Sequence, residues 1–149
     1  MPSLLQRLWV VLALAAASSC RSPAATLELD PRTPAVAQGQ LIEDLGIETL
    51  GGVFTPLLTR GQSLPCEMTE TFSTAADDQE HVEIRLFRGS AKLARDATLV
   101  GRFVIEGLPK LPRGVSLVAV TFSVAADGAV VVTAREKSGH RVTLRRSDG

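Results

Sequence analysis

The chain has 149 residues with 16 basic and 16 acidic side chains, and 45% of its residues are hydrophobic. This length fits one domain. The balanced charge provides no sequence-wide attraction for nucleic acid or acidic lipid, and the apolar content is too high for a disordered chain. Two cysteines allow only one disulfide, between Cys20 and Cys66, which excludes a disulfide-rich scaffold.

Residues 1–20 have the pattern of a secretory signal peptide. Arg7 supplies a short basic start, residues 8–17 are all apolar, and two serines precede Cys20. Ten apolar residues span about 15 Å as a helix, roughly half the hydrocarbon core of a bilayer, so we do not expect a transmembrane helix. The segment predicts an exported protein, either free in the bacterial periplasm or anchored to a membrane as a lipoprotein.

The end of this segment, Ala17-Ser18-Ser19-Cys20, resembles a bacterial lipobox, in which the cysteine is lipidated and becomes the new N-terminus after cleavage. We therefore predict a lipid on Cys20, which leaves Cys66 as a lone thiol. Two alternatives stay open at this point. Cleavage near Ser19 would leave Cys20 as a free thiol, and a misassigned start codon would make the protein cytoplasmic.

Residues 21–40 have the composition of a flexible tether. Three of the eight prolines fall in this stretch, and no hydrophobic period persists through it. Regular alternation of polar and apolar residues begins after it. The sequence therefore predicts a signal peptide at residues 1–20, a tether at residues 21–40 and one folded domain at residues 41–149.

Alternating residues predict several β-strands in this domain. In the stretch that begins at His81, the side chains of Val82, Ile84 and Leu86 share one face. Residues 118–124 alternate in the same way, and a turn joins them to a second run as a hairpin. The partner run and the other expected strands are residues 129–133, 46–49, 53–59, 69–73, 100–105 and 142–144.

Seven or eight short strands without a helical period beyond the signal predict an all-β fold, an antiparallel β-sandwich of about eight strands. Pro56 cannot donate a hydrogen bond to a strand ladder, so we expect its strand at a sheet edge or bulge. The core is expected to be aliphatic, with five phenylalanines as its aromatic members: Phe54, Phe72, Phe87, Phe103 and Phe122.

The sequence contains no complete catalytic or metal-binding motif. His81 and Glu83 match the His-x-Glu of zinc deaminases, but the only trace of the Pro-Cys-x-x-Cys partner is Pro65-Cys66, which precedes them. On a strand these two side chains form a solvated polar face. No serine nucleophile elbow and no phosphate-binding loop is present. We therefore expect no enzymatic activity, no cofactor and no metal ion.

From Leu45 to Thr55 the sequence Leu-Gly-Ile-Glu-Thr-Leu-Gly-Gly-Val-Phe-Thr closely resembles the start of the β-sandwich substrate-binding domain of the heat-shock-seventy (DnaK-type) chaperone family. Six further blocks follow in the family's order and extend the similarity to about Leu144: residues 72–77, 82–84, 101–103, 112–114, 120–122 and 126–128. In this family the sandwich holds an extended peptide in a channel and seats one apolar side chain in a central pocket.

The resemblance implies which residues bind the peptide. The central pocket falls on Ile47, Phe72, Val82, Ile84 and Val118, and the arch over the peptide falls on Leu50 and Ala75. Backbone groups near Thr49, Ser73 and Glu83 are expected to hydrogen-bond the peptide backbone. Packing in an ordinary core is the alternative explanation for each apolar side chain of this set.

The resemblance also implies a function, namely ATP-independent, holdase-like binding of extended hydrophobic segments of unfolded proteins, without nucleotide or nucleic acid. The nucleotide-binding domain and the helical lid of the family find no match in this sequence, so Asp77 and Arg113, which match lid-latching residues, are expected to lack a partner in the chain. Two alternatives stay open. One is a structural or interaction lipoprotein whose channel is closed, for instance by residues 145–149, and the other is a fragment of a full-length ATP-dependent DnaK-type chaperone.

Overall fold

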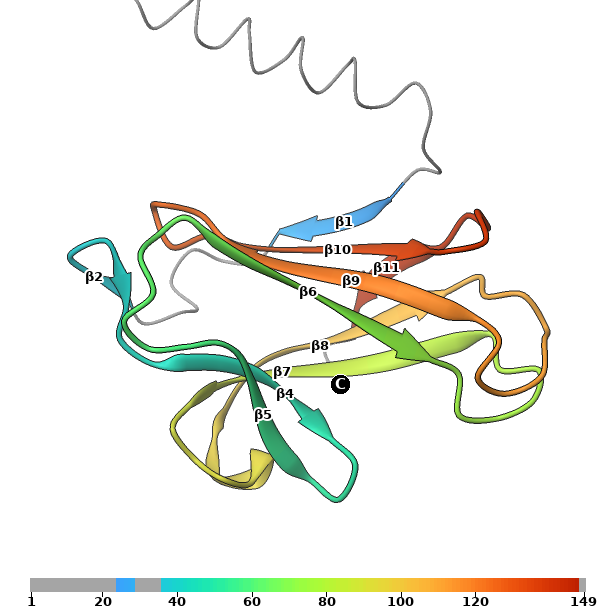
Figure 1. The fold of residues 1–149 in the computed structure, drawn as a ribbon, viewed down its shortest axis with the longest axis horizontal. Helices are drawn as coiled ribbons and strands as arrows, with labels where there is room; N and C mark the ends of the chain where they lie inside the picture. The colour runs from blue at the N-terminus through green and yellow to red at the C-terminus, as the bar shows by residue number, and fades with distance from the viewer. Residues whose placement is uncertain (1–23, 29–35, 148–149) are drawn as a thin grey trace, which may run out of the picture.

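The computed structural model describes residues 24–28 and 36–147, which form two antiparallel sheets packed face to face (Figure 1). The four-stranded sheet has the order β1 (Ala25–Glu28), β10 (Val130–Glu136), β9 (Leu117–Val124) and β6 (Cys66–Ser73). The five-stranded sheet has the order β11 (Thr143–Arg146), β8 (Thr98–Glu106), β7 (His81–Gly89), β4 (Asp44–Thr49) and β5 (Val53–Leu58). A small hairpin of β2 (Val36–Ala37) and β3 (Gln40–Leu41) and a 3-10 turn, η1 (Ala94–Asp96), complete the described elements. The predicted all-β sandwich is confirmed.

The strands form where the sequence alternates. In β7 the side chains of Val82, Ile84 and Leu86 are buried between the sheets, and the residues between them are exposed. The predicted hairpin of β9 and β10 is also present, with Val124 opposite Val130. Its turn is closed by the carboxylate of Asp127, which accepts a hydrogen bond from the backbone N–H of Ala129 at 3.0 Å.

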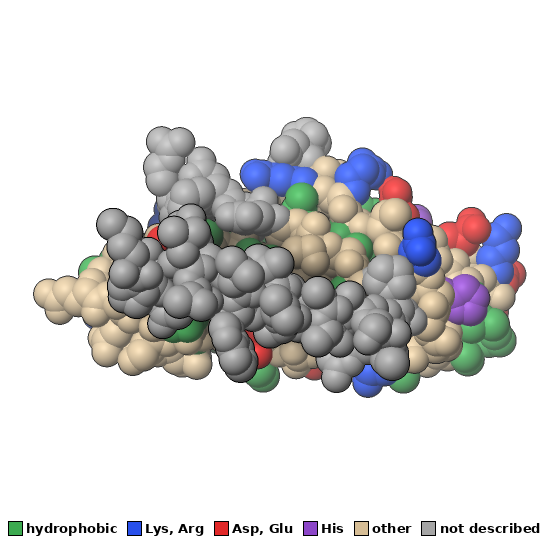
Figure 2. All heavy atoms as spheres, turned by 90° about the horizontal axis from the view of Figure 1, so that it is seen from above, with side chains coloured by type: hydrophobic (Ala, Val, Ile, Leu, Met, Phe, Trp, Pro, Cys, Tyr) green, Lys and Arg blue, Asp and Glu red, His purple; other side chains and the backbone are tan. Residues whose placement is uncertain are grey.

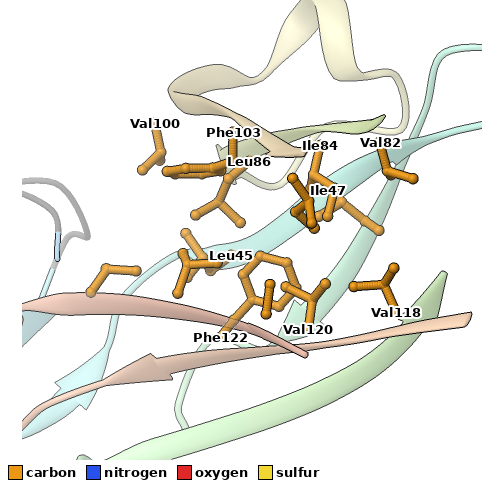
Figure 3. Packing of buried hydrophobic residues seen from close by; sticks show 14 of the residues in the cluster. Leu45, Ile47, Val82, Ile84, Leu86, Val100, Phe103, Val118, Val120 and Phe122 are labelled. Atoms are coloured by element: carbon orange, nitrogen blue, oxygen red, sulfur yellow. The ribbon is translucent and has the colours of Figure 1, made fainter. Parts of the chain in front are cut away.

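The space between the sheets is filled by a single aliphatic core, in which Phe103 and Phe122 are fully buried (Figure 3). A second, smaller cluster combines Phe54 and Phe87 with Ala94 of the 3-10 turn. Phe72 is only partly buried and packs against the main core. Because of the alternation, the larger apolar side chains point into the space between the sheets. Their burial there provides the main driving force for folding.

Pro56 lies in β5, which is an edge strand of the five-stranded sheet, as its missing N–H requires. The register of β4 and β5 shifts next to Gly46, which lies opposite Pro56. A Cβ atom at Gly46 would overlap the carbonyl oxygen of Thr55 and come within 2.9 Å of the ring of Phe54. The close approach of β5 at this bulge therefore requires a residue without a side chain.

Part of the predicted tether is a strand. Residues 25–28 form β1 and pair with β10 along its outer edge, with Thr26 opposite Thr133 and Leu27 opposite Val132. Leu27 packs against the main core. The four-residue strand is too short to show a period, and the prolines around it favour a reading as loop.

The predictions for the signal peptide and for Cys20 fall on residues 1–23, which lie outside the described part of the chain. Cys66 is a free thiol, and burial raises the pKa of its side chain. Within residues 24–28 and 36–147, no helix is long and apolar enough to cross a membrane. The same residues hold no cluster of three or more His, Cys, Asp or Glu side chains suited to a metal ion.

Charged side chains are dispersed over the visible surface. Figure 2 views the molecule from above the four-stranded sheet of Figure 1, and in the part that grey atoms leave visible, Lys and Arg lie near Asp and Glu. This distribution agrees with the zero formal net charge of the sequence.

Candidate functional site

The ladder between β4 and β7 is incomplete, and this opens the five-stranded sheet at one end. β4 pairs with β7 only as far as Ile47, which lies opposite Leu86. The next residues, Glu48 and Thr49, pair with β5 alone. Residues 81–85 of β7 pair with β8 on one side, and no described strand pairs with them on the other. An unpaired strand edge of this kind can hydrogen-bond an added extended chain.

A hollow of about 430 Å³ lies at this split. Three of the predicted peptide-binding residues line it, namely Thr49, Leu50 and Glu83. Leu50 lies at the tip of the β4–β5 hairpin and is 99% exposed. The complete lining is Glu48, Thr49, Leu50, Gly51, Gly52, Glu83 and Arg85.

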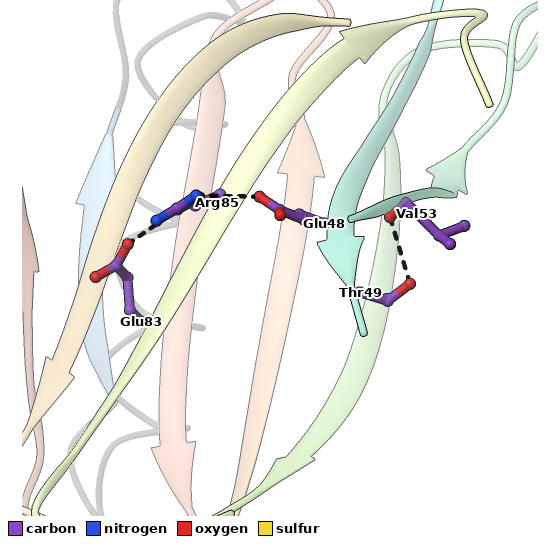
Figure 4. A network of polar contacts seen from close by, with 5 residues as sticks. All are labelled: Glu48, Thr49, Val53, Glu83 and Arg85. Carbon is purple, nitrogen blue, oxygen red and sulfur yellow. Dashed lines mark hydrogen bonds and ion pairs between the residues drawn. The ribbon is translucent and has the colours of Figure 1, made fainter. Parts of the chain in front are cut away.

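Arg85 connects the two strands where their backbones separate (Figure 4). Its Nη1 atom lies 3.3 Å from a carboxylate oxygen of Glu48 on β4, and its Nε atom lies 3.1 Å from a carboxylate oxygen of Glu83. The hydrogen bond to Glu83 and the charge of Glu48 raise the pKa of the Arg85 guanidinium. Because all three side chains are partly exposed, each pair contributes only about 0–1 kcal/mol, so the connection can be broken at low cost.

A pair of threonine hydroxyls lies on the inner side of the same hairpin. The Thr49 and Thr55 hydroxyl oxygens are 2.8 Å apart, and the Thr49 hydroxyl also donates to the Val53 carbonyl at 3.3 Å. Thr55 lies directly opposite Ile47, so the pair shares the face of the sheet that carries the apolar core. The wall of the opening is thus partly polar, with hydroxyl groups beside the buried aliphatic side chains.

The five predicted pocket residues come together in the main core, three from one sheet and two from the other. Phe72 of β6 lies directly opposite Val118 of β9 in the four-stranded sheet. Figure 3 shows Ile47, Val82 and Ile84 of the five-stranded sheet facing Val118 across the gap between the sheets. The structure therefore joins side chains that are up to 71 residues apart in the sequence, since Ile47 and Val118 belong to the same cluster.

These pocket residues expose little surface. The exposed fractions are 8% for Val82, 4% for Ile84, 2% for Ile47 and 0% for Val118. These side chains pack against one another as part of the core. A side chain of a bound peptide could enter only by separating them. The neighbouring strands β5 and β6 belong to different sheets and share no ladder of hydrogen bonds.

The predicted arch residue Ala75 lies exposed in the loop between β6 and β7 (residues 74–80), and Ser73 is the last residue of β6. This loop is fastened to the loop between β8 and β9 (residues 107–116). The backbone N–H of Thr74 donates to the Ser116 carbonyl at 3.3 Å, and the N–H of Gly114 donates to the Thr74 carbonyl at 2.8 Å. Ala75 is thus presented by a loop with a defined conformation.

The expectation that Asp77 and Arg113 lack a partner within the chain is wrong for the Asp77 side chain, which bonds to the backbone of Arg113. The backbone N–H of Arg113 donates to the Asp77 carboxylate at 2.9 Å. The two residues meet because their loops lie against each other, which their separation of 36 positions in the sequence does not reveal.

The described part of the C-terminal tail does not close the channel. Arg145 and Arg146 belong to β11 and lie opposite Val104 and Phe103 of β8, at the other edge of the five-stranded sheet. Arg145 also forms an ion pair with Glu106 at 2.7 Å. The alternative in which residues 145–149 fill the channel is therefore wrong for Arg145 and Arg146, and residues 148–149 lie outside the described part.

Three residues beside the predicted site were not singled out from the sequence: Thr55, Gln79 and Arg85. Thr55 and Arg85 each continue the alternation of a strand, so the sequence predicts which face of the sheet each one occupies. Their bonds, of Thr55 to Thr49 and of Arg85 to Glu48, depend on how the hairpin leaves the sheet. Gln79 lies in the loop after β6 and bonds to backbone atoms, for which no local sequence signal exists.

The fold and this opening together describe an antiparallel β-sandwich that is split at one end over an aliphatic core. Residues 40–145 match the family model described as "Hsp70 protein". The chain is 47% identical over 102 residues to "Chaperone protein DnaK" of Anaplasma marginale (strain St. Maries), covering 68% of this chain and 16% of the relative. It is 44% identical over 108 residues to "Heat shock 70 kDa protein, mitochondrial" of Dictyostelium discoideum, covering 70% of this chain and 16% of that relative.

The chain belongs to the Hsp70 family. It spans about 16% of the length of these two relatives. One expectation from the sequence is corrected by this membership: the chain was expected not to be an enzyme, whereas the Hsp70 and DnaK proteins of its family are ATPases.

Proposed function

We propose that the sandwich binds extended hydrophobic segments of unfolded proteins at the split between β4 and β7. The observation that carries this proposal is the unpaired edge at residues 81–85, which borders a hollow lined by Thr49, Leu50 and Glu83. A bound chain would hydrogen-bond this edge and direct one apolar side chain toward Ile47 and the rest of the pocket. Membership of the Hsp70 family supports the same reading.

The proposed contacts predict weak binding. Burying one leucine side chain contributes about 1.5–3 kcal/mol. Each backbone hydrogen bond adds about 0.5–1.5 kcal/mol. Association and ordering of the peptide cost about 4 kcal/mol or more. We therefore expect a dissociation constant on the order of micromolar to millimolar, with fast exchange.

We further propose that the sandwich holds its ligand in the manner of a holdase, without a nucleotide. All the contacts named above come from the described strands and loops, so binding needs no second ligand. Main-chain bonds give affinity with little sequence preference, and the pocket selects apolar side chains. The affinity for a peptide is then the same in the presence and absence of ATP.

The central pocket can be tested by filling it. We expect Val82→Phe to abolish binding of a fluorescent heptapeptide with a central leucine, measured by anisotropy, because the larger ring occupies the place of the leucine side chain. Val131→Phe is the matched control, since it makes the same change on the outer face of β10. Equal affinities for wild type and Val82→Phe would contradict the assignment of the pocket.

A second variant covers the case in which Val82→Phe unfolds the protein, because overpacking a core costs about 1–3 kcal/mol. Leu50→Asp changes a side chain that is 99% exposed, so the fold is unaffected. It places a charge on the arch over the peptide and is expected to weaken binding severalfold. An unchanged affinity would remove Leu50 from the site.

A second candidate function is favoured by the low exposure of Val82, Ile84, Ile47 and Val118. If these contacts do not open, the domain is a structural or interaction module with a closed channel. Backbone amide shifts during a titration with the heptapeptide separate the two functions, because peptide binding moves the resonances around Val82 and a closed module shows no change. A fragment of an ATP-dependent DnaK-type chaperone, the third reading, is compatible with the 16% share of the relatives' length.

For residues 1–20 we propose export to the periplasm or attachment to a membrane through a lipid on Cys20. The basic start, the ten apolar residues and the resemblance to a lipobox support this proposal. Mass spectrometry of the protein purified from a bacterial host tests it. The expected species begins at a lipidated Cys20, and an intact Met1 would contradict export.

A further inference from the structure

Gln79 makes three hydrogen bonds to the backbone that connect the loop of the predicted arch residue Ala75 with the start of β7. Its side-chain carbonyl oxygen accepts hydrogen bonds from the backbone N–H groups of Ala75, at 2.9 Å, and Ala76, at 3.1 Å. Its side-chain NH2 group donates to the carbonyl of His81 at 2.6 Å. The first two partners belong to the loop that carries the arch residue Ala75, and His81 is the first residue of the unpaired edge of β7.

The convergence of two successive N–H groups on one oxygen forms a concave site that suits a carbonyl or carboxylate oxygen. In this protein the primary amide of Gln79 fills that site. A primary amide has the same C=O acceptor and N–H donor as a peptide group of the backbone. Gln79 therefore makes, from within the chain, the bonds that one peptide group of an extended ligand would make between Ala75 and His81.

We propose that the side-chain amide of Gln79 is an internal substitute for one peptide group of the bound chain, and that ligand binding displaces it. This inference rests on the proposed function, since it assigns a regulator to the same site. Gln79 keeps the loop N–H groups and the His81 carbonyl paired while the site is empty. The cost of releasing these bonds lowers the affinity and speeds the release of the ligand.

The inference predicts the sign of a mutational effect. Gln79→Ala removes the competing amide and leaves the Ala75 and Ala76 N–H groups to water until the ligand arrives. Because one intramolecular hydrogen bond contributes about 0.5–1.5 kcal/mol net, the peptide should bind about 2- to 10-fold more tightly to this variant. If Gln79 only supports the loop, the same variant binds more weakly, because Ala75 is no longer held in place.

A matched control is available at another loop. The side-chain carbonyl of Gln62 accepts a hydrogen bond from the backbone N–H of Thr59 at 2.6 Å, in the loop between β5 and β6. Gln62→Ala removes the same kind of bond outside the proposed site. We expect it to leave the affinity for the heptapeptide unchanged in the anisotropy assay on the full chain.

A second measurement applies to the wild-type protein and does not depend on how the variant folds. The side-chain NH2 resonances of Gln79 are followed by nuclear magnetic resonance while the heptapeptide is added. We expect them to shift with the same dissociation constant as the anisotropy, together with the backbone amides of Ala75 and Ala76. Binding that leaves the Gln79 resonances in place, or weaker binding by Gln79→Ala, overturns this inference alone. The absence of any binding to wild type overturns the proposed function instead.

Discussion

At the scale of single residues, Glu136 is an acidic side chain that is almost completely buried. It lies at the end of β10 opposite Val118 and is only 2% exposed. Burial by itself raises the pKa of its carboxyl, but hydrogen bonds from Ser138 and His140 outweigh the burial, so the pKa lies below its usual value. The bonds come from the backbone N–H and hydroxyl of Ser138, at 2.8 and 2.6 Å, and from the N–H of His140, at 3.2 Å.

A lowered carboxyl pKa in the folded state means that Glu136 stabilises the protein when it is ionised. This stabilisation is complete above the ordinary glutamate pKa of 4.5 and is lost as the pH falls through the lower folded value. We expect Glu136→Gln to reduce the free energy of unfolding by about 1–3 kcal/mol at neutral pH, because hydrogen bonds to a charged group are replaced by weaker ones. Urea unfolding at a series of pH values measures this difference in the free energy of unfolding.

Two features of that experiment decide the outcome. The difference between wild type and Glu136→Gln should shrink toward zero as the carboxylate is protonated, and Glu67→Gln on the exposed face of β6 should cost little at any pH. A difference that persists unchanged into acid would show that Glu136 acts through its shape and packing, with no role for its charge.

At the scale of the elements, the alternation of polar and apolar residues was sufficient to predict a strand where the strand is long and has one buried face. The strands β7 and β9 follow the predicted stretches because Val82, Ile84 and Leu86, and then Val118 to Val124, must all reach the same core. Pro56 was correctly expected at an edge or bulge, since a missing N–H limits a residue to such positions wherever its strand pairs.

Other elements do not follow from local pattern. β1 has four residues and the β2–β3 hairpin has two in each strand, so pairing with a neighbour decides their conformation. The split between β4 and β7 after Ile47 likewise depends on how two strands pair. The local sequence does not reveal it, because Glu48 continues the alternation without a break. The residues of the candidate site were named through resemblance to a family, and the alternation independently places two of them, Val82 and Ile84, on one buried face. The bonds of Gln79 and the pairing of Asp77 with Arg113 required the loops in three dimensions.

At the scale of the whole molecule, the two sheets have edges with different environments. The edges formed by β5 and β6 lie next to each other without a shared ladder. The opposite edge of the four-stranded sheet is formed by β1, which also contacts β11 of the other sheet. By pairing with β10, β1 satisfies backbone groups of β10 that would otherwise be free to pair with another chain. The four-stranded sheet thus ends at β1 on one side, and the edge that is open for strand pairing lies in the other sheet, at residues 81–85 of β7.

This arrangement predicts that β1 contributes to stability and leaves ligand binding unaffected. Leu27 is partly buried and packs against the core, whereas its neighbour Thr26 is exposed on the same strand. We expect Leu27→Asp to lower the free energy of unfolding by about 1–3 kcal/mol, because it places a charge against apolar side chains, and Thr26→Asp to change it by less than about 0.5 kcal/mol. Urea unfolding measures both variants, and the anisotropy assay should give wild-type affinity for the heptapeptide. If the two variants have equal and small effects, β1 does not pair with β10 in solution, and the outer edge of the four-stranded sheet is free.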